Sequence, residues 1–446
     1  MNKKLLTAAA FALIGLSVQG QQIDFEEYNL DNGLHVILHQ DNSAPVVTTG
    51  VMYHVGSKDE QVGKTGFAHF FEHLLFEGTH NIERGEWFKI VSSHGGSNNA
   101  NTTTDRTYYY ETFPSNNLEL GLWMESDRLL QPIINQVGVD TQKEVVKEEK
   151  RQRLDNQPYG RFSYGEALSP HIFDKHPYRW SVIGSFEDLS SAKLEDFKHF
   201  SKTYYVPNNA VLVVAGDFKK DEAKKLIAKY FGAIPKGAPV VKNFPKEDPI
   251  TSERRVTEYD NNIQIPLLAI NYRTPNNKSK DAIALNMLST YLSGGKSSVL
   301  YKKYVDEKKE ALQIFAFNRQ MEDYGIYTIG VLPQGQVKLT DLEASIQKDI
   351  ENVQSELISE KDYQKLLNTV ENSFVAQRSG MQNIAHQLAD AYMLQGDTNK
   401  INTELKAYQS VSREDIREVA KKYLGKNQRV IVNYLPASEK DKSTNP

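Results

Sequence analysis

Hydrophobic and polar positions along the chain predict a mixture of short strands and longer helices. Residues 46–55, VVTTGVMYHV, are rich in β-branched residues, and a further strand ends at residues 108–112. The sequence Asp31-Asn32-Gly33 separates two apolar runs and is typical of a hairpin turn. Residues 118–130 carry apolar side chains at helical spacing. Because helices and strands are interleaved, we predict the α+β class, built from layers of sheet and helix.

One helical stretch is hydrophobic on every face. Residues 66–79, GFAHFFEHLLFEGT, are mostly apolar, yet they include His69, Glu72 and His73. A helix without a polar face is normally buried, and burial of unsatisfied polar side chains costs several kcal/mol. We therefore expect these three polar residues to meet a binding partner.

The two halves of the chain share a repeated segment. Residues 194–214 align without gaps with residues 413–433, and seven positions are identical. Each copy predicts an amphipathic helix, a tight turn and a β-rich strand. The repeat indicates two related domains that each combine a sheet with helices.

A proline-rich stretch separates these halves. Residues 231–251, FGAIPKGAPVVKNFPKEDPIT, hold four prolines, which exclude a helix or a central strand. We therefore place a first domain at residues 21–233, a linker at 234–250, a second domain at 251–437 and a polar tail at 438–446.

Composition excludes several classes of function. The 446 residues are 39% hydrophobic, and 53 basic against 57 acidic residues give a formal charge of −4. This length supports two or three cores, and no basic run marks a nucleic-acid-binding surface. The absence of cysteine excludes disulfides, thiolate catalysis and cysteine metal ligands.

The first 20 residues are typical of a secretory signal peptide. Lys3 and Lys4 precede an apolar run over residues 5–18, and small residues precede Gln21. The run is shorter than the roughly 20 residues that a membrane-spanning helix needs. We expect an exported protein with no membrane span, and we favour the periplasm over the external medium.

His69, Glu72 and His73 share one face of their predicted helix. They stand at positions i, i+3 and i+4, where helical side chains are neighbours. Two imidazoles one turn apart can bind one Zn²⁺, and the glutamate is placed to take a proton from a metal-bound water. The order His-x-x-Glu-His inverts the His-Glu-x-x-His arrangement of other zinc peptidases.

A catalytic zinc needs a third protein ligand, which must be His, Asp or Glu in a chain without cysteine. Residues 141–155, TQKEVVKEEKRQRLD, predict a helix whose apolar positions are its two adjacent valines. At about 100° per residue, Glu149 falls midway between those valines, whereas Glu148 falls about 110° away. A carboxylate centred on an apolar stripe needs a partner. Glu149 is therefore the predicted ligand, with Glu148 as the alternative and Gln142 as a supporting hydrogen-bonding residue.

The motif GKTGFAHFFEHLLFEGT resembles the signature of the inverzincin zinc peptidases, the family of pitrilysin, insulin-degrading enzyme and mitochondrial processing peptidase. The stretches at residues 95–114, 176–189 and 204–217 also resemble that family. The resemblance covers almost the whole chain and is weaker in the second half. It implies two related domains that form half of a clam shell, with Zn²⁺ on His69, His73 and Glu149 and with Glu72 as the general base.

The same resemblance implies a binding site for an extended peptide. Residues 98–112 have the composition of an edge strand, and such an edge can add a peptide through backbone hydrogen bonds. The resemblance places Asn99 and Ala100 nearest the cleaved bond. The predicted function is a zinc endopeptidase that hydrolyses unfolded peptides. The alternative is a non-catalytic scaffold subunit of the same fold, which the zinc content would distinguish.

Two departures from the family pattern predict a partner chain. The family stretch that matches residues 292–317 carries an arginine and, seven residues later, a tyrosine, where this chain has Asp306 and Gln313. An acidic residue cannot polarise a carbonyl as a cation does. We therefore expect the zinc-bearing subunit of a heterodimer whose other chain supplies the pair. The alternatives are a homodimer, or replacement of the pair by Arg319 or Tyr324 in a shifted register.

Overall fold

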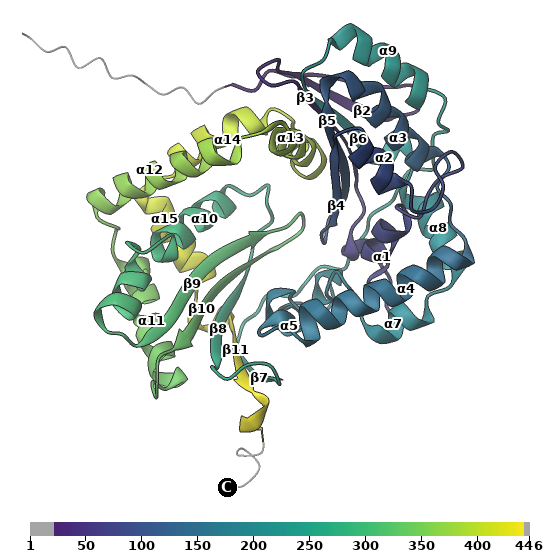
Figure 1. Ribbon diagram of the computed structural model, residues 1–446. Helices are drawn as coiled ribbons and strands as arrows, with labels where there is room; N and C mark the ends of the chain where they lie inside the picture. Colours follow the sequence, from purple (N-terminus) through teal and green to yellow (C-terminus); the bar gives the residue numbers. More distant parts are fainter. Residues whose placement is uncertain (1–21, 441–446) are drawn as a thin grey trace, which may run out of the picture.

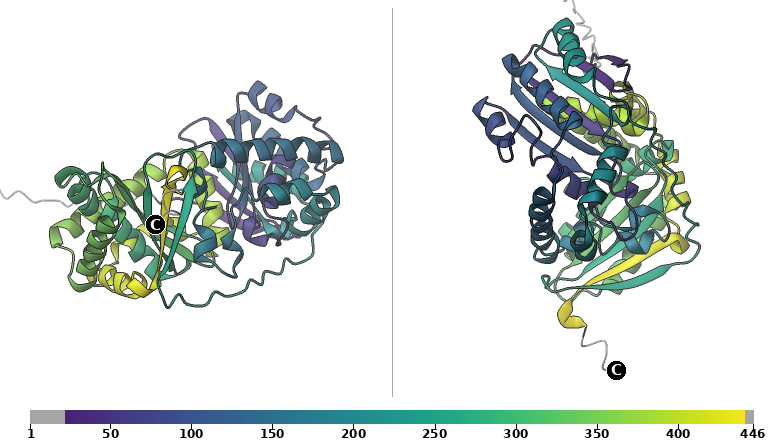
Figure 2. Two further views of the ribbon diagram at one scale, coloured as in Figure 1. Left: turned by 90° about the horizontal axis from the view of Figure 1, so that it is seen from below. Right: turned by 90° about the vertical axis from the view of Figure 1, so that its right-hand side faces the viewer.

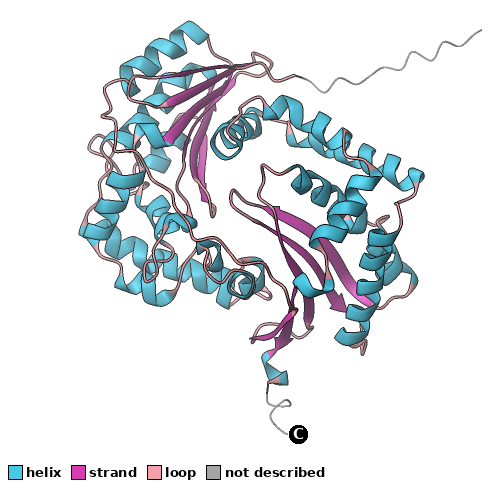
Figure 3. Ribbon diagram, turned by 180° about the vertical axis from the view of Figure 1, so that it is seen from behind, coloured by secondary structure: helices cyan, strands magenta, loops and turns pink. Residues whose placement is uncertain are grey.

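The computed structural model describes residues 22–440, so the predicted signal peptide and the end of the polar tail lie outside the described residues. Each half of the chain contains one β-sheet with its own helices (Figures 1 and 3). The first sheet has the order β1 (Glu26–Asn29), β2 (His35–Gln40), β6 (Ala210–Gly216), β3 (Val46–Tyr53), β5 (Thr107–Pro114) and β4 (Ser97–Thr102). The second has the order β7 (Arg254–Asp260), β11 (Arg429–Pro436), β8 (Leu267–Thr274), β10 (Gly325–Pro333) and β9 (Ala311–Gln320). The α+β prediction is confirmed.

The two sheets share one topology. Strand β6 lies between parallel β2 and antiparallel β3, and β11 lies between parallel β7 and antiparallel β8. Helix α8 (Leu194–Tyr204) leads into β6, as α15 (Arg413–Tyr423) leads into β11. The predicted helix–turn–strand repeat is thus present in both halves. The first sheet adds β1, which pairs with β2 across the predicted hairpin turn, where Gly33 adopts a φ of 88°.

The remaining helices surround the sheets. In the first half they are α1 (Phe67–Leu74), α2 (Trp87–Ser93), α3 (Leu118–Leu130), α4 (Gln136–Lys150), α5 (Gly160–Ser163), α6 (Ser169–Ile172), α7 (Phe186–Ser191) and α9 (Lys220–Phe231). In the second half they are α10 (Lys280–Ser293), α11 (Leu339–Ser355), α12 (Glu360–Gln377), α13 (Met381–Gln395) and α14 (Lys400–Gln409). No helix among residues 22–440 is long and apolar enough to cross a membrane.

Each half covers one face of the other half's sheet. Helix α13 of the second half packs Ile384 and Leu388 against Ile37 and Val213 of the first sheet. In return, the segment that contains α5 and α6 packs side chains such as Leu168 against the second sheet. Figure 1 shows α13 against the first sheet, and α5 to the right of β8 and β11 of the second sheet. Because apolar burial is the main source of stability, this exchange joins the halves firmly.

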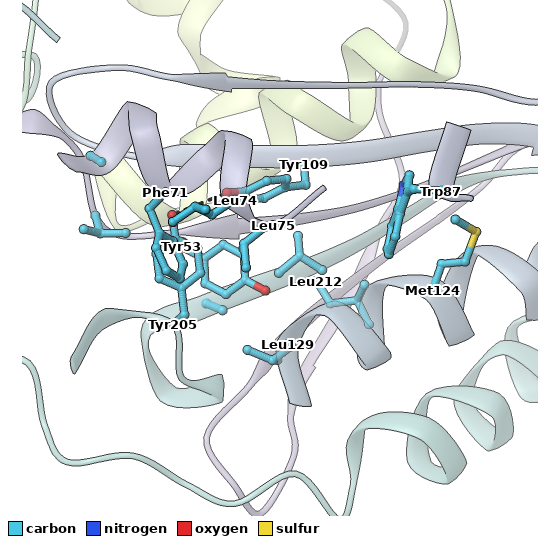
Figure 4. Packing of buried hydrophobic residues seen from close by; sticks show 14 of the residues in the cluster. Tyr53, Phe71, Leu74, Leu75, Trp87, Tyr109, Met124, Leu129, Tyr205 and Leu212 are labelled. Carbon is cyan, nitrogen blue, oxygen red and sulfur yellow. Dashed lines mark hydrogen bonds between the residues drawn. The ribbon is translucent and has the colours of Figure 1, made fainter. Parts of the chain in front are cut away.

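The apolar side of α1 packs into the core of the first half. Phe71 lies 4.3 Å from Tyr205 and Tyr53 lies 4.5 Å from Tyr205, measured between ring centroids. Figure 4 shows Phe71 and Leu74 among these aromatic rings. The packing holds α1 at a fixed orientation, with its polar residues directed away from the core.

Three predicted boundaries differ in the structure. The helix predicted over residues 66–79 ends at Leu74, and the chain turns at Gly78, whose φ is 117°. The edge strand predicted over 98–112 is a hairpin, in which β4 is the edge and β5 is internal. Residues 232–253 contain no helix or strand and form a long loop (Figure 2). The domain limits themselves stay a prediction.

Candidate metal centre

The start of α1 is fixed by two residues that precede it. Gly66 adopts a φ of 86°, and a Cβ built there would lie 2.5 Å from the carbonyl oxygen of Ile183. The carboxylate of Glu60 accepts hydrogen bonds from the backbone N–H groups of Gly66 and Ala68 at 2.9 and 2.8 Å. This carboxylate satisfies donors that a helix leaves free at its N-terminus. Glu60 was not predicted from the sequence, because it lies six residues before Gly66 and matches no known capping pattern.

Three predicted ligands converge on one point. The Nε2 atoms of His69 and His73 lie 3.3 Å apart, and Oε2 of Glu149 lies 3.5 and 3.1 Å from them. Helix α4 brings Glu149 there because it packs against α1. Tetrahedral ligands at about 2.0–2.1 Å from Zn²⁺ are separated by about 3.3 Å. Two imidazoles and one carboxylate with these separations therefore fit a zinc site.

The charges at this centre suit metal binding. Burial, followed by the charge of His73, lowers the pKa of His69 to about 4, which keeps its imidazole neutral as a ligand must be. Burial lowers the pKa of His73, but the hydrogen bond and charge of Glu149 outweigh it, and the pKa is raised. For Glu149, burial is outweighed by the two histidines and Arg153, so its pKa is lowered. Its Oε1 lies 3.0 Å from Nη1 of Arg153.

Glu72 stands beside the ligands without joining them. Its carboxylate accepts a hydrogen bond from the hydroxyl of Thr102 on β4. Burial raises the pKa of Glu72 against the opposing effect of that hydrogen bond. A carboxylate with a raised pKa is suited to exchange protons near neutral pH.

Gln142 and Glu148 take different places around the centre. The Nε2 group of Gln142 donates a hydrogen bond to Glu77, and its buried Oε1 has no partner among residues 22–440. Glu148 faces solvent, with its side chain 52% exposed and 3.1 Å from Arg151. The structure therefore favours Glu149 over Glu148 as the third ligand.

A cavity of about 770 Å³ opens beside the centre. Besides the three ligands and Glu72, its walls include Asn99, Ala100 and Thr102 of β4, Phe76, Phe88, Val145, Arg153 and Arg319. Strand β4 is the edge of its sheet, and the N–H of Ala100 donates to the side chain of its neighbour Asn99 at 2.9 Å. The predicted substrate-binding residues thus border the same cavity as the predicted ligands.

Among residues 22–440, the second half contributes one residue to this cavity. Arg319 of β9 lines it, whereas Asp306, Gln313 and Tyr324 are not among its lining residues. The hydroxyl of Tyr324 accepts a hydrogen bond from the backbone N–H of Glu247 at 2.9 Å, at a separate place. Gln313 and Arg319 lie six residues apart on β9, which corresponds to about 20 Å along a strand. Of the residues considered for a shifted register, Arg319 alone reaches the candidate site in the described chain.

Two models of known protein families match this chain, one in each half. A family model described as insulinase, peptidase family M16, matches residues 35–184. A second, described as the peptidase M16 inactive domain, matches residues 191–370. Both halves therefore match models of one peptidase family, and the candidate ligands lie in the first half. The chain belongs to peptidase family M16.

Individual relatives agree along the whole chain. The zinc protease PqqE of Helicobacter pylori is 30% identical over 97% of this chain and 99% of its own length. A probable mitochondrial-processing peptidase subunit beta of Arabidopsis thaliana is 23% identical over 89% of this chain and 75% of its own. The crystal structure of a protease from Helicobacter pylori superposes with a TM-score of 0.87 at 29% identity, over 93% of this chain and 100% of that one.

Two longer structures share the fold. Pitrilysin matches with a TM-score of 0.75 at 19% identity, over 94% of this chain and 45% of its own. The periplasmic protease PqqL from Escherichia coli matches with a TM-score of 0.78 at 18% identity, over 96% of this chain and 49% of its own. This chain thus corresponds in length to about half of each, and the fold is that of half of a clam shell.

Proposed function

We propose that this chain is a zinc-dependent endopeptidase subunit that hydrolyses unfolded peptides. One observation carries the proposal: His69, His73 and Glu149 converge within 3.1–3.5 Å, beside Glu72, in a cavity bordered by an open strand edge. Such an edge adds an extended peptide through backbone hydrogen bonds. A peptide on β4 would pass Asn99 and Ala100 and bring a carbonyl to the metal centre.

Each residue has a defined task in this proposal. His69, His73 and Glu149 would hold Zn²⁺, which when bound supplies a Lewis acid for the peptide carbonyl and lowers the pKa of its water. Glu72 takes the proton of the attacking water and passes it to the leaving amine. The hydroxyl of Thr102 keeps the carboxylate of Glu72 in place.

The proposal includes a partner subunit. Pitrilysin and PqqL are about twice as long as this chain, which supports a second subunit of the same fold that closes the shell. The proposed assembly is a heterodimer whose partner supplies the arginine and tyrosine absent at Asp306 and Gln313, with a homodimer as the alternative. The signal-like N-terminus supports a periplasmic location.

Hydrolysis of quenched, unstructured peptides by the zinc-loaded chain tests the proposal. Glu72→Gln is expected to retain about one zinc per chain and to lose turnover by about 10²–10⁴-fold, because it removes the general base. Zinc content is measured by elemental analysis of both proteins. A Glu72→Gln variant that cleaves at the normal rate would overturn the role of Glu72. A chain that binds no zinc would favour the scaffold. Zinc binding without turnover in the lone chain would require the partner.

A further inference from the structure

A second pocket opens beside the metal cavity. It has a volume of about 360 Å³ and shares Ser163 and Arg319 with that cavity. The volume is far above the roughly 30 Å³ that one water occupies in the liquid. The pocket therefore continues the candidate site towards the second half of the molecule.

One wall of this pocket is the face of β9 that carries Phe315, Phe317 and Arg319. These three residues alternate along the strand, and alternate residues point to the same face of a sheet. Ile326 of β10 lies opposite Arg319 in the register and extends the wall. Phe317 is 40% exposed. The second sheet is thus left uncovered near its β9 edge.

The other wall comes from the first half of the chain. Phe162 of α5 and Leu168, just before α6, line it, and both belong to the apolar cluster that covers the second sheet. The cluster also includes Ile326 of β10, and Phe315 of β9 packs against it, so the pocket lies between two apolar surfaces that meet at its inner end. An apolar group that entered it would be removed from water on both sides.

Arg319 stands at the junction of the two cavities, where the charge of Asp105 acts on it without a direct ion pair. Its side chain is exposed, and it makes no ion pair or hydrogen bond with any other residue of the described chain. A Cβ built on Gly165 would lie 3.8 Å from Nη1 of Arg319, which places the guanidinium against the loop between α5 and α6. A guanidinium beside an apolar pocket is suited to bind a carboxylate, because it presents paired N–H donors.

We propose that this pocket is a side-chain subsite for the peptide: it accepts a large apolar side chain, while Arg319 binds a carboxylate next to that side chain. The inference rests on the proposed function for the class of ligand. The shared residues and the unpaired cation support it, because a peptide lying in the metal cavity reaches the pocket without leaving the site. The carboxylate is either an acidic side chain or the C-terminus of the peptide.

Binding of labelled peptides to zinc-loaded Glu72→Gln protein tests the subsite. The probes are twelve-residue peptides of Gly, Ser and Gln with a central Phe-Glu, together with versions that carry Ala-Glu or Phe-Gln. A further pair ends in Phe, with a free or an amidated C-terminus. Phe-Glu is expected to bind about tenfold more tightly than Ala-Glu, since the pocket removes the aromatic side chain from water. Loss of the carboxylate is expected to weaken binding about fivefold.

Matched variants locate these preferences. Phe317→Ala is expected to remove the preference for Phe, and Arg319→Gln the preference for the carboxylate, whereas Arg319→Lys retains part of it. Leu312→Ala is the control, because Leu312 is 48% exposed on the same strand and lines neither cavity. Discrimination confined to the amidated pair would assign the carboxylate to the C-terminus, and discrimination between Phe-Glu and Phe-Gln would assign it to a side chain.

Other results overturn the subsite. The subsite is contradicted if the zinc-loaded Glu72→Gln protein binds no peptide or binds all the peptides equally. It is also contradicted if Leu312→Ala loses as much selectivity as Phe317→Ala. These outcomes are separate from hydrolysis, since the protein used carries Glu72→Gln. Selective binding with no turnover in the protein that retains Glu72 would keep the subsite and remove the proposed activity. Turnover without selective binding would keep the proposed activity and remove the subsite.

Discussion

Helices α1 and α10 occupy equivalent places in the two halves, but they carry different chemistry. Helix α1 follows β3, and α10 follows β8; each of these strands is the third from the edge of its sheet. Helix α1 packs against the edge strand β4, and α10 packs against the edge strand β9. Helix α1 presents His69, Glu72 and His73 to the cavity. Helix α10 presents Asn286, whose side chain accepts a hydrogen bond from Asn318 of β9 at 2.9 Å. One slot of the fold thus holds a candidate zinc centre, and the other holds a network of neutral amides.

The two edge strands differ in the same way. The N–H of Ala316 in β9 donates to the hydroxyl of Ser293 in α10 at 2.6 Å, and that hydroxyl donates to the carbonyl of Ala316 at 3.0 Å. In β4, the N–H of Ala100 is bonded to the neighbouring Asn99. The edge of β9 is therefore closed at this position, whereas β4 can exchange a local hydrogen bond for an added strand. The fold thus supplies two equivalent positions, and the side chains placed there determine which of them can bind a metal and a peptide.

The largest effect is expected from a change at Glu149, the candidate zinc ligand of the first half. Glu149→Gln is expected to lower zinc affinity by more than about 100-fold, the upper end of what loss of a supporting residue around a metal costs. Glu148→Gln is the matched control, because the neighbouring carboxylate faces solvent beside Arg151, and it should leave affinity unchanged. Competition with a chelator measures both. Equal affinities would contradict the geometry of the centre.

A core substitution tests whether the halves are one structural unit. Leu388 of α13 is fully buried against the first sheet, so Leu388→Ala is expected to lower the free energy of unfolding by about 2–5 kcal/mol. The three tryptophans, Trp87, Trp123 and Trp180, all lie in the first half, and their fluorescence during urea unfolding reports on that half.

Exposed Val375 of α12 provides the control for this substitution, since Val375→Ala is expected to change stability by less than about 0.5 kcal/mol. If the tryptophan-monitored transition did not move in Leu388→Ala, the first half would be stable without the helix that covers its sheet.

Local patterns in the sequence predicted the repeat and the helix that carries Glu149, but for partly different reasons. The helix–turn–strand copies follow from period and turn chemistry, which are local. The choice of Glu149 rests on a stripe between two valines, yet only Val146 is buried, while Val145 is 44% exposed and lines the cavity. The apolar stripe faces a cavity as well as the core. A side chain that lines the cavity lies on the same side of the helix as one that enters the core, so Glu149 was placed correctly relative to the valines.

What the sequence could not predict comes from contacts between distant segments. The packing of α13 on the first sheet joins residues that are far apart in the chain, and no periodicity encodes which sheet an apolar helix covers. Arg319 reaches the cavity because of the placement of the second sheet relative to the first. Glu60 caps α1 from a loop. These features depend on tertiary structure, which a reading of local pattern does not contain.

Acid is expected to weaken the attachment of the second sheet to the first half. Between β9 and β10, Glu322 lies 2.8 Å from His54 and 2.7 Å from Lys58. Burial raises the pKa of Glu322, but the hydrogen bonds and charges of His54 and Lys58 outweigh it and lower the pKa to about 2. Because the folded pKa is lowered, the stabilisation is present above the unfolded pKa and is lost as pH falls from about 4.5 to about 2. Its size is about 3 kcal/mol.

Urea unfolding at pH 7, 4 and 3 measures this dependence. Glu322→Gln is expected to lower stability at pH 7 and to flatten the decline between pH 4 and pH 3. Glu310→Gln is the control, because Glu310 pairs with Lys308 within the second half. An unchanged pH profile in Glu322→Gln would show that this carboxylate does not hold the halves together.

The smallest expected effect concerns the open edge itself. Asn99→Ala releases the N–H of Ala100 from its local hydrogen bond, so an added peptide strand no longer has to displace that bond. Since one hydrogen bond contributes about 0.5–1.5 kcal/mol net, binding of an unstructured peptide to zinc-loaded Glu72→Gln protein should tighten about two- to tenfold. Ser293→Ala opens the equivalent position on β9 and should leave peptide affinity unchanged. If Ser293→Ala tightened binding as much as Asn99→Ala, both edges would take peptide, and the difference between the halves would lie in their ligands alone.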